Sequence, residues 1–193
     1  ILRDYITDQE LYEKIVDRYE SKKSNEDLFI MSISMQNHGG YTEKYDNFDE
    51  KARMLGINYP DVNQYLSLIH ESDSALEYLI SYFEKVDDPV EIVFFGDHQP
   101  SLSSSFYPYL NGKGLGGLTL SELENLYTVP FFIWTNYDSD KESVELTSLN
   151  YLSTLALERA GIALPAYNQF LADMMEEIPA VNSRGFYSKS QGK

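Results

Sequence analysis

The sequence predicts an α/β domain in which a largely parallel sheet is flanked by helices. Three observations predict this class: short apolar runs typical of buried strands, amphipathic stretches between them, and polar, glycine-bearing loops directly after two of the strands. In sheets of this kind, ligands bind beyond the carboxyl ends of the strands. The chain has 193 residues, which suits one domain with a sizeable core.

The N-terminal third contains a predicted helix and a predicted strand. Residues 7–21 have helical periodicity, and Thr7 and Glu10 have the spacing of a capping box. The apolar run 28–33 contains β-branched and aromatic residues, which favours a buried strand. The loop that follows, residues 36–41, contains two glycines and a histidine.

The middle of the chain contains the clearest strand. Residues 60–86 are expected to form a long amphipathic helix that ends before Pro89. Residues 90–95 then form an apolar run that ends abruptly at Gly96. The stretch 101–120 is rich in serine and glycine, so we expect an excursion loop there, bordering the substrate groove, rather than a core element.

The C-terminal third is expected to add one strand and two helices. Residues 129–134 are a third apolar run, residues 148–160 predict a helix that Gly161 ends, and residues 168–177 predict another helix. The sequence contains no internal repeat and no sign of a second domain. Residues 1–193 are therefore expected to belong to a single domain.

Charge and composition exclude several classes of partner. The formal net charge is −16, whereas nucleic-acid binding needs clustered Lys and Arg, so no nucleic-acid partner is expected. The chain has no cysteine, which excludes disulfides, thiolate chemistry and Cys-based zinc sites. It has no run of about 18 apolar residues, so nothing in it is expected to span a bilayer. A divalent cation suits this acidic background.

Asp97 and His98, directly after the strand predicted at 90–95, are candidate metal ligands. Carboxylate oxygen and imidazole nitrogen are good ligands for Zn²⁺ or Mn²⁺, and a sharp turn at Gly96 would aim both at one ion. An isolated pair of this kind is more often a turn-capping aspartate beside a surface histidine. The pair alone therefore does not decide between the two interpretations.

His38 follows the other predicted strand. Gly39 and Gly40 beside it would let a ligand approach the backbone, and an imidazole there could bind a phosphate oxygen or a metal. The alternative is a solvated loop histidine. The third histidine, His70, lies on or beside the apolar face of the helix predicted at 60–86 and is expected to be structural.

Together these segments resemble the sulfatase-like branch of the alkaline phosphatase superfamily, and within it the lipoteichoic acid synthase family of phosphoglycerol transferases. Residues 29–41 resemble the family's strand and substrate-contacting histidine loop, and residues 92–102 resemble its Gly-Asp-His metal motif. Residues 129–134 match the strand that follows that motif, and residues 148–179 are also similar. The resemblance thus covers most of the chain.

The resemblance implies one divalent metal ion, Mn²⁺ with Mg²⁺ or Zn²⁺ as alternatives, bound by an Asp-His pair, an acidic residue and a nucleophilic threonine. On this basis Asp97 and His98 are expected to bind the metal, and His38 to hold the substrate phosphoryl group. The expected reaction moves a phosphoglycerol group from a lipid or polymer to the threonine, and then to an acceptor on a polymer or glycan.

The sequence departs from the family's pattern on the N-terminal side, where the family's nucleophile and acidic ligand lie well upstream of the histidine loop. Here only 37 residues precede His38. We therefore expect residues 1–193 to be the C-terminal part of a sulfatase-like catalytic domain, inactive alone, with the missing N-terminal part of the same enzyme as its partner. The family implies an enzyme of the bacterial cell membrane, attached through an upstream anchor, with an extracellular catalytic domain.

Two other functions are compatible with the same residues. A sulfatase or phosphatase acting on another ester would share the ligands and the fold. A non-catalytic module would use the site to hold an anionic cell-wall polymer. A plain structural domain would leave the two histidine loops without explanation.

Overall fold

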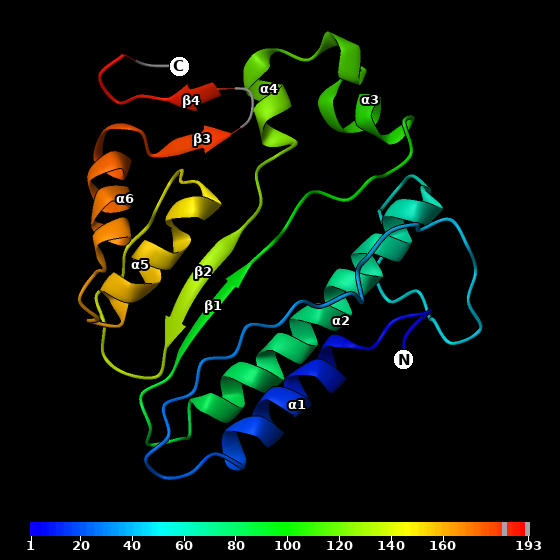
Figure 1. Cartoon of the computed structure of the whole chain (residues 1–193). Coiled ribbons are helices and arrows are strands. Elements are labelled where there is room, and N and C mark those ends of the chain that lie inside the picture. Colours follow the sequence, from blue (N-terminus) through cyan, green and yellow to red (C-terminus); the bar gives the residue numbers. More distant parts are fainter. Residues whose placement is uncertain (183–184, 192–193) are drawn as a thin grey trace. The chain divides into compact units, whose positions relative to one another are not determined.

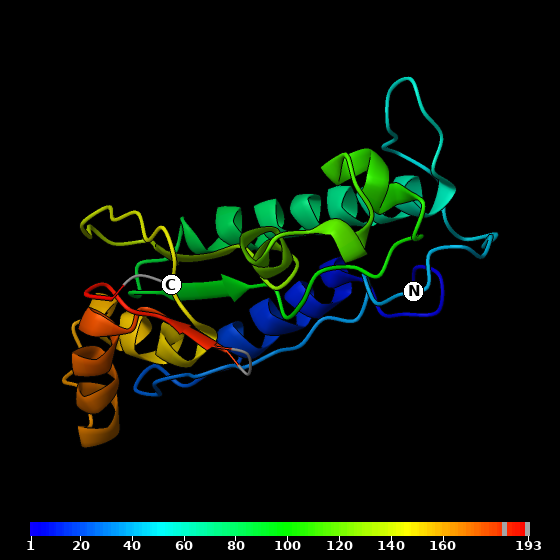
Figure 2. The ribbon, with the colours of Figure 1, turned by 90° about the horizontal axis from the view of Figure 1, so that it is seen from above.

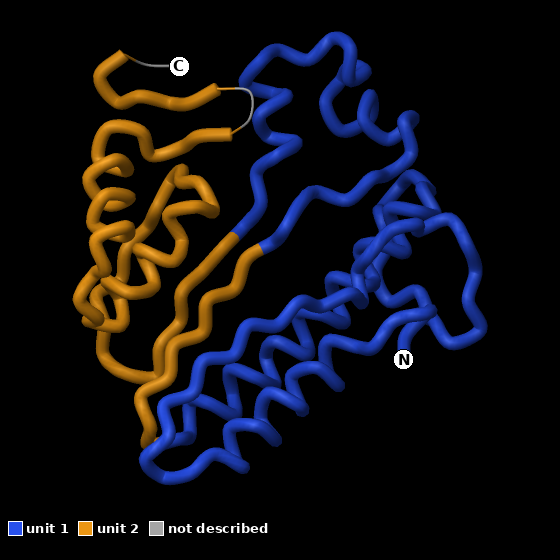
Figure 3. The backbone as a smooth tube through the Cα atoms, in the orientation of Figure 1, with its two compact units in different colours: residues 1–86, 96–130 blue, residues 87–95, 131–193 orange. Residues whose placement is uncertain are grey.

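The computed structural model describes residues 1–182 and 185–191. The chain divides into two compact units (Figure 3). Unit 1 comprises residues 1–86 and 96–130, and unit 2 comprises residues 87–95 and 131–193. No helix among the described residues combines the length and apolar character needed to cross a membrane.

Unit 1 is built on two helices, α1 (Asp8–Glu20) and α2 (Pro60–Phe83), which pack along each other (Figures 1 and 2). The predicted capping box is confirmed, because the Thr7 hydroxyl accepts from Glu10 N while the Glu10 carboxylate accepts from Thr7 N. Between them lie buried apolar side chains of both helices: Tyr12, Val16, Val62, Leu68, Ala75, Leu79 and Phe83.

A buried carboxylate, that of Asp8, lies at the start of α1. Ser72 on α2 donates to one of its oxygens, while the other oxygen, Oδ1, is buried without a hydrogen-bond partner. Burial raises the pKa of Asp8 above its ordinary value of 3.8, and the hydrogen bond from Ser72 lowers it by less.

The raised pKa of Asp8 predicts a specific pH dependence of stability. A group whose pKa is higher in the folded state stabilises that state below its unfolded pKa, and this stabilisation is lost as the pH rises through the folded pKa. The free energy of unfolding of the wild type, minus that of Asp8→Asn, should therefore fall as the pH rises from 3.8. Urea titrations of both proteins between pH 4 and pH 7 measure this difference, and a difference that rises with pH would contradict it.

The apolar run 28–33 does not form a strand, so that prediction is wrong. Phe29, Met31 and Ile33 are 90%, 71% and 74% exposed. Within the described residues, the backbone groups of residues 28–33 form no hydrogen bond with another backbone group. A strand exists only where a neighbour pairs with its N–H and C=O groups, and alternating apolar residues cannot specify that neighbour.

The stretch 101–120 contains helical turns, contrary to the predicted excursion loop. It is anchored at the start of α2, where Ser103 N donates to the Asp61 carboxylate at 2.7 Å and the buried Phe106 ring packs on Tyr59, with centroids 5.4 Å apart. This aromatic anchor outweighs the serine- and glycine-rich composition. The helical elements of residues 96–130 are α3 (Phe106–Asn111), η1 (Leu115–Gly117) and α4 (Leu120–Asn125).

Unit 2 contains the strands. β1 (Glu91–Phe95) and β2 (Phe131–Thr135) pair antiparallel, with Phe94 stacked on its partner Phe132. β3 (Ala180–Asn182) and β4 (Gly185–Tyr187) form a second antiparallel pair. The described residues thus contain the predicted mixture of helices and strands, but with antiparallel pairs where parallel ones were expected.

The two C-terminal helices are confirmed. The first begins as the 3-10 turn η2 (Leu149–Tyr151), continues as α5 (Leu152–Arg159) and is followed by Gly161 at a φ of 68°. The second is α6 (Ala166–Glu177). Tyr151 is fully buried, and its hydroxyl donates to Ile178 O at 2.7 Å, which ties the start of α5 to the end of α6.

Candidate functional site

Asp97 and His98 lie in a bend that follows β1 and Gly96. Gly96 N donates to Pro130 O at 3.1 Å. A Cβ at residue 96 would lie 3.1 Å from Val129 Cβ, so a larger residue would push the two segments apart. The glycine therefore allows the close approach that places the next two side chains at the end of the strand.

The side chains of Asp97 and His98 converge. His98 Nε2 lies 3.3 Å from Asp97 Oδ2, and His98 Nδ1 lies 2.9 Å from Gln99 O. Because a carbonyl oxygen can only accept, Nδ1 carries the proton, and Nε2 is the nitrogen that faces the carboxylate. Both side chains are open to solvent, at 72% exposure for His98 and 82% for Asp97.

This pair fits as one part of a metal site. Metal bonds to imidazole nitrogen and carboxylate oxygen measure about 2.0–2.2 Å, so two ligand atoms on one ion stand roughly 3 Å apart. The separation of His98 Nε2 from Asp97 Oδ2 matches this value, and Gln99 O orients the ring as outer partners of metal-bound histidines do. No group of three or more His, Cys, Asp or Glu capable of holding an ion occurs in the part of the chain that the structure describes.

His38 lies in unit 1, in an exposed loop. Gln36 and Tyr41, at the two ends of this loop, are buried. Its Nδ1 lies 3.0 Å from Gly39 O and 3.1 Å from the Tyr5 hydroxyl. The carbonyl again requires the proton on Nδ1, which leaves Nε2 as the atom available to a ligand. The Tyr5 ring packs against the imidazole, with centroids 5.7 Å apart.

Tyr41 is bonded to the backbone of this loop, and the bend at Asp97 also belongs to unit 1. The Tyr41 ring is buried, and its hydroxyl donates to Asn37 O at 2.7 Å. Burial raises the pKa of Tyr41, the neighbouring Tyr65 adds to the effect, and the charge of Arg3 opposes it. No hydrogen bond or ion pair among the described residues joins His38 to Asp97 or His98.

The roles predicted for the three site residues stay predictions, because no ligand contact tests them. His70 is exposed on α2, so it is not part of the packed face of that helix. Arg3, a buried side chain that holds the histidine loop, was not among the residues predicted for the site. Arg3 and His38 are 35 positions apart, and no motif or periodicity relates two residues at that separation. No sequence signal therefore pointed to Arg3.

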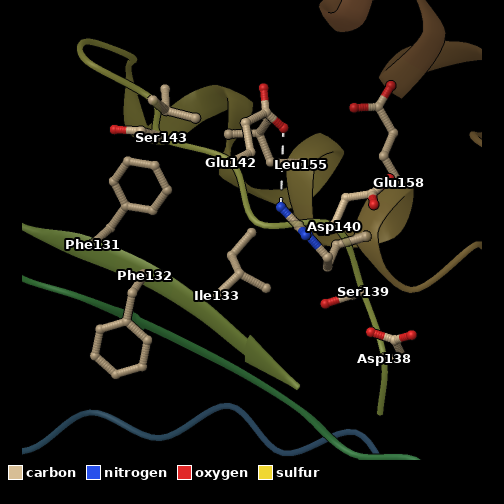
Figure 4. A pocket seen from close by; sticks show the side chains of 12 residues that line it. Phe131, Phe132, Ile133, Asp138, Ser139, Asp140, Glu142, Ser143, Leu155 and Glu158 are labelled. Atoms are coloured by element: carbon tan, nitrogen blue, oxygen red, sulfur yellow. Dashed lines mark ion pairs between the residues drawn. The ribbon is translucent and has the colours of Figure 1, made fainter. Parts of the chain in front are cut away.

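A cavity of about 580 Å³ in unit 2 contains none of these residues (Figure 4). It is lined by β2, by α5 and by the segment between them. Arg159 in its wall forms an ion pair with Glu142 at 4.0 Å. The other charged side chains of the lining are carboxylates, which would repel a phosphate ester: Asp138, Asp140 and Glu158.

Comparisons with known proteins relate most of the chain to one family. Residues 3–162 match the family model described as Sulfatase. The capsular polysaccharide biosynthesis protein RkpI of Rhizobium meliloti (strain 1021) is 34% identical over 105 residues, which cover 54% of this chain and 18% of RkpI. A putative cyclic beta-1,2-glucan modification protein of the same organism is 22% identical over 180 residues, covering 89% of this chain and 28% of that protein.

Among solved structures, the Streptococcus pyogenes phosphoglycerol transferase GacH in complex with sn-glycerol-1-phosphate has a similar fold, with a TM-score of 0.68. The identity is 22%, and the match covers 92% of this chain and 43% of GacH. The chain therefore spans less than a third of the two curated relatives and less than half of this structure.

Proposed function

Because this chain belongs to the sulfatase family, as the match over residues 3–162 shows, we propose that it is the C-terminal part of a metal-dependent phosphoglycerol transferase. The α/β fold of the sulfatase-like type that the sequence predicts is confirmed by the family match and the fold likeness. The observation that carries the proposed chemistry is the bend at Asp97 and His98, where a carboxylate oxygen and an imidazole nitrogen lie 3.3 Å apart.

The proposed roles follow from the geometry of each side chain. Asp97 Oδ2 and His98 Nε2 would hold one divalent cation, Mn²⁺ first, with Mg²⁺ or Zn²⁺ as alternatives. When bound, such an ion lowers the pKa of a nucleophile and neutralises charge on a phosphoryl oxygen. His38 would present Nε2 to another phosphoryl oxygen, because Gly39 O and Tyr5 occupy its Nδ1. The nucleophile and a further acidic ligand would come from the rest of the enzyme.

The proposed substrate is a phosphoglycerol-bearing lipid or polymer of the cell envelope. Two relatives carry names in capsular polysaccharide biosynthesis and glucan modification, which supports an envelope glycan or polymer as the acceptor. The enzyme would sit in the bacterial cell membrane through an anchor upstream, with this domain outside. The net charge of −16 is compatible with an anionic substrate only where a cation offsets it locally, as the proposed metal would.

The family match itself favours one alternative, a sulfatase acting on a sulfate ester. The intact enzyme distinguishes the two activities when it is offered phosphatidylglycerol and an aryl sulfate in parallel. Release of diacylglycerol without release of sulfate supports the phosphoglycerol transferase. Sulfate release alone would replace it with the sulfatase.

Metal removal tests the cation. Treatment of the intact enzyme with EDTA should reduce diacylglycerol release to background, and added Mn²⁺ should restore it, because a phosphoryl-transfer site of this kind depends on the ion for charge neutralisation. The isolated chain should bind Mn²⁺ weakly, since it supplies two ligands, and this can be followed by the loss of the free Mn²⁺ EPR signal. Full activity in EDTA would refute metal dependence.

A further inference from the structure

Arg3 is a buried cation that bonds to three backbone carbonyls of the histidine loop. Its Nη1 donates to Gly40 O at 3.1 Å, and its Nη2 donates to Gln36 O at 3.1 Å and to His38 O at 2.5 Å. Nη1 also donates to Gln64 Oε1 on α2. One side chain therefore sets the positions of residues before, at and after His38 and ties them to the core of unit 1.

The way in which Arg3 is buried is costly for the fold. Arg3 is 3% exposed, no described carboxylate forms an ion pair with it, and its Nε has no hydrogen-bond partner. Its backbone adopts a φ of 52°, a conformation that side-chain-bearing residues rarely take. A buried charge without an ionic partner destabilises a protein, and such costs persist mainly where they serve a site.

Tyr5 is held in the same local turn as Arg3. Leu2 and Tyr5 exchange two backbone hydrogen bonds of 2.8 and 3.0 Å, and the turn between them directs both side chains to the histidine loop. The Arg3 guanidinium lies 5.6 Å from the Tyr5 ring centroid. The Tyr5 hydroxyl in turn contacts His38 Nδ1. Arg3 thus fixes the backbone of His38, while Tyr5 fixes its ring.

We propose that Arg3 and Tyr5 are positioning residues for His38, which set its backbone and its ring so that Nε2 faces the phosphoryl group. This inference rests on the proposed function, in which His38 contacts the substrate. Neither residue reacts. Arg3 also places an unneutralised positive charge beneath a loop that would receive an anion, in a chain of net charge −16.

The kinetic test uses the intact enzyme with Arg3→Lys and Tyr5→Phe. Lysine keeps the charge but cannot reach several carbonyls in a planar fork, and phenylalanine keeps the ring but loses the hydroxyl. We expect kcat/KM to fall about 10-fold or more for Arg3→Lys and about 3-fold or more for Tyr5→Phe, because small misplacements of a contacting group are costly. Val16→Ala, a buried change in α1, is the matched control and should lower stability but leave kcat/KM within about 2-fold.

A double-mutant cycle separates positioning from general damage. In a His38→Ala background, Arg3→Lys and Tyr5→Phe should cause no further loss, because the group they position is absent. Equal losses in both backgrounds would overturn the proposal. If His38→Ala alone leaves kcat/KM unchanged, the proposed role of His38 in the reaction fails. Whether Arg3 and Tyr5 position the His38 ring must then be decided by a measurement that does not use activity.

NMR of the imidazole nitrogens of this chain provides that independent measurement. The chain has three histidines, so His38 can be assigned with one variant, and the exposed His70 serves as an internal reference. We expect a single Nδ1–H tautomer for His38 in the wild type and a mixture of tautomers or shifted ring nitrogens in the Arg3 and Tyr5 variants. Identical His38 signals in all three proteins would refute the positioning role.

Discussion

His98→Ala is expected to lower phosphoglycerol release by the intact enzyme at least about 100-fold, and Asp97→Asn by a similar factor. Alanine removes Nε2, the ring nitrogen that lies 3.3 Å from Asp97 Oδ2, and asparagine replaces a charged ligand by a neutral one. Because the two ligands act on one ion, the double variant should lose no more than the stronger single variant. Diacylglycerol release from phosphatidylglycerol, measured over a range of Mn²⁺ concentrations, checks both statements.

His70→Ala is the matched control for this experiment. It removes the same type of side chain from an exposed position on α2 that has no part in the proposed site. Its activity should stay within about 2-fold of the wild type, as for most surface substitutions. If His98→Ala behaves like His70→Ala, Asp97 and His98 do not hold a catalytic metal, and the proposed function loses its main support.

Arg3→Met is expected to lower the free energy of unfolding of unit 1 by about 2 kcal/mol, because the buried acceptors that it leaves unpaired cost more than removal of the buried charge gains. The substitution leaves the carbonyls of Gln36 and Gly40, and the amide oxygen of Gln64, without their donor. Urea unfolding followed by far-UV circular dichroism measures this change, because the signal comes mainly from helices and the two longest described helices, α1 and α2, belong to unit 1. Fluorescence is the wrong probe, because the single tryptophan, Trp134, lies in unit 2.

Arg18→Met provides the comparison for Arg3→Met. Arg18 forms an ion pair with Glu26 at 2.6 Å, but both side chains are partly exposed, so the pair is worth less than about 1 kcal/mol. The same residue type therefore gives a large and a small effect in one unit. A loss from Arg3→Met as small as that from Arg18→Met would mean that water or neighbouring groups replace the guanidinium, and the histidine loop would not depend on it.

Several elements were predictable because the interactions that form them are local. The capping box of Thr7 and Glu10 needs residues three positions apart, and it forms at the predicted place. α2 also forms where its periodicity predicts, although it ends at Phe83 rather than at residue 86. A bend at Asp97 and His98 follows the predicted strand, and local hydrogen bonds with His98 N and Gln99 O hold the two side chains near each other.

The two elements that were predicted wrongly, the strand at 28–33 and the loop at 101–120, depend on contacts with residues distant in sequence. Residues 28–33 have the composition of a strand, but the described residues supply no neighbour to pair with them. The segment around Phe106 has the composition of a loop, but it is helical and anchored because the Phe106 ring packs on Tyr59. Such contacts are fixed by how segments pack, and periodicity carries no information about them.

The amino-acid sequence by itself determined the family, the helices α1, α2, α5 and α6, and the Asp97–His98 pair, because short motifs and local hydrogen bonds encode them. Only the tertiary structure decided what holds His38. Arg3 reaches three carbonyls of the histidine loop, and Tyr5 reaches the imidazole, through contacts that span more than 30 positions. Every residue has the same backbone carbonyl, so the residue types at positions 36–40 carry no information that an arginine side chain donates to these carbonyls.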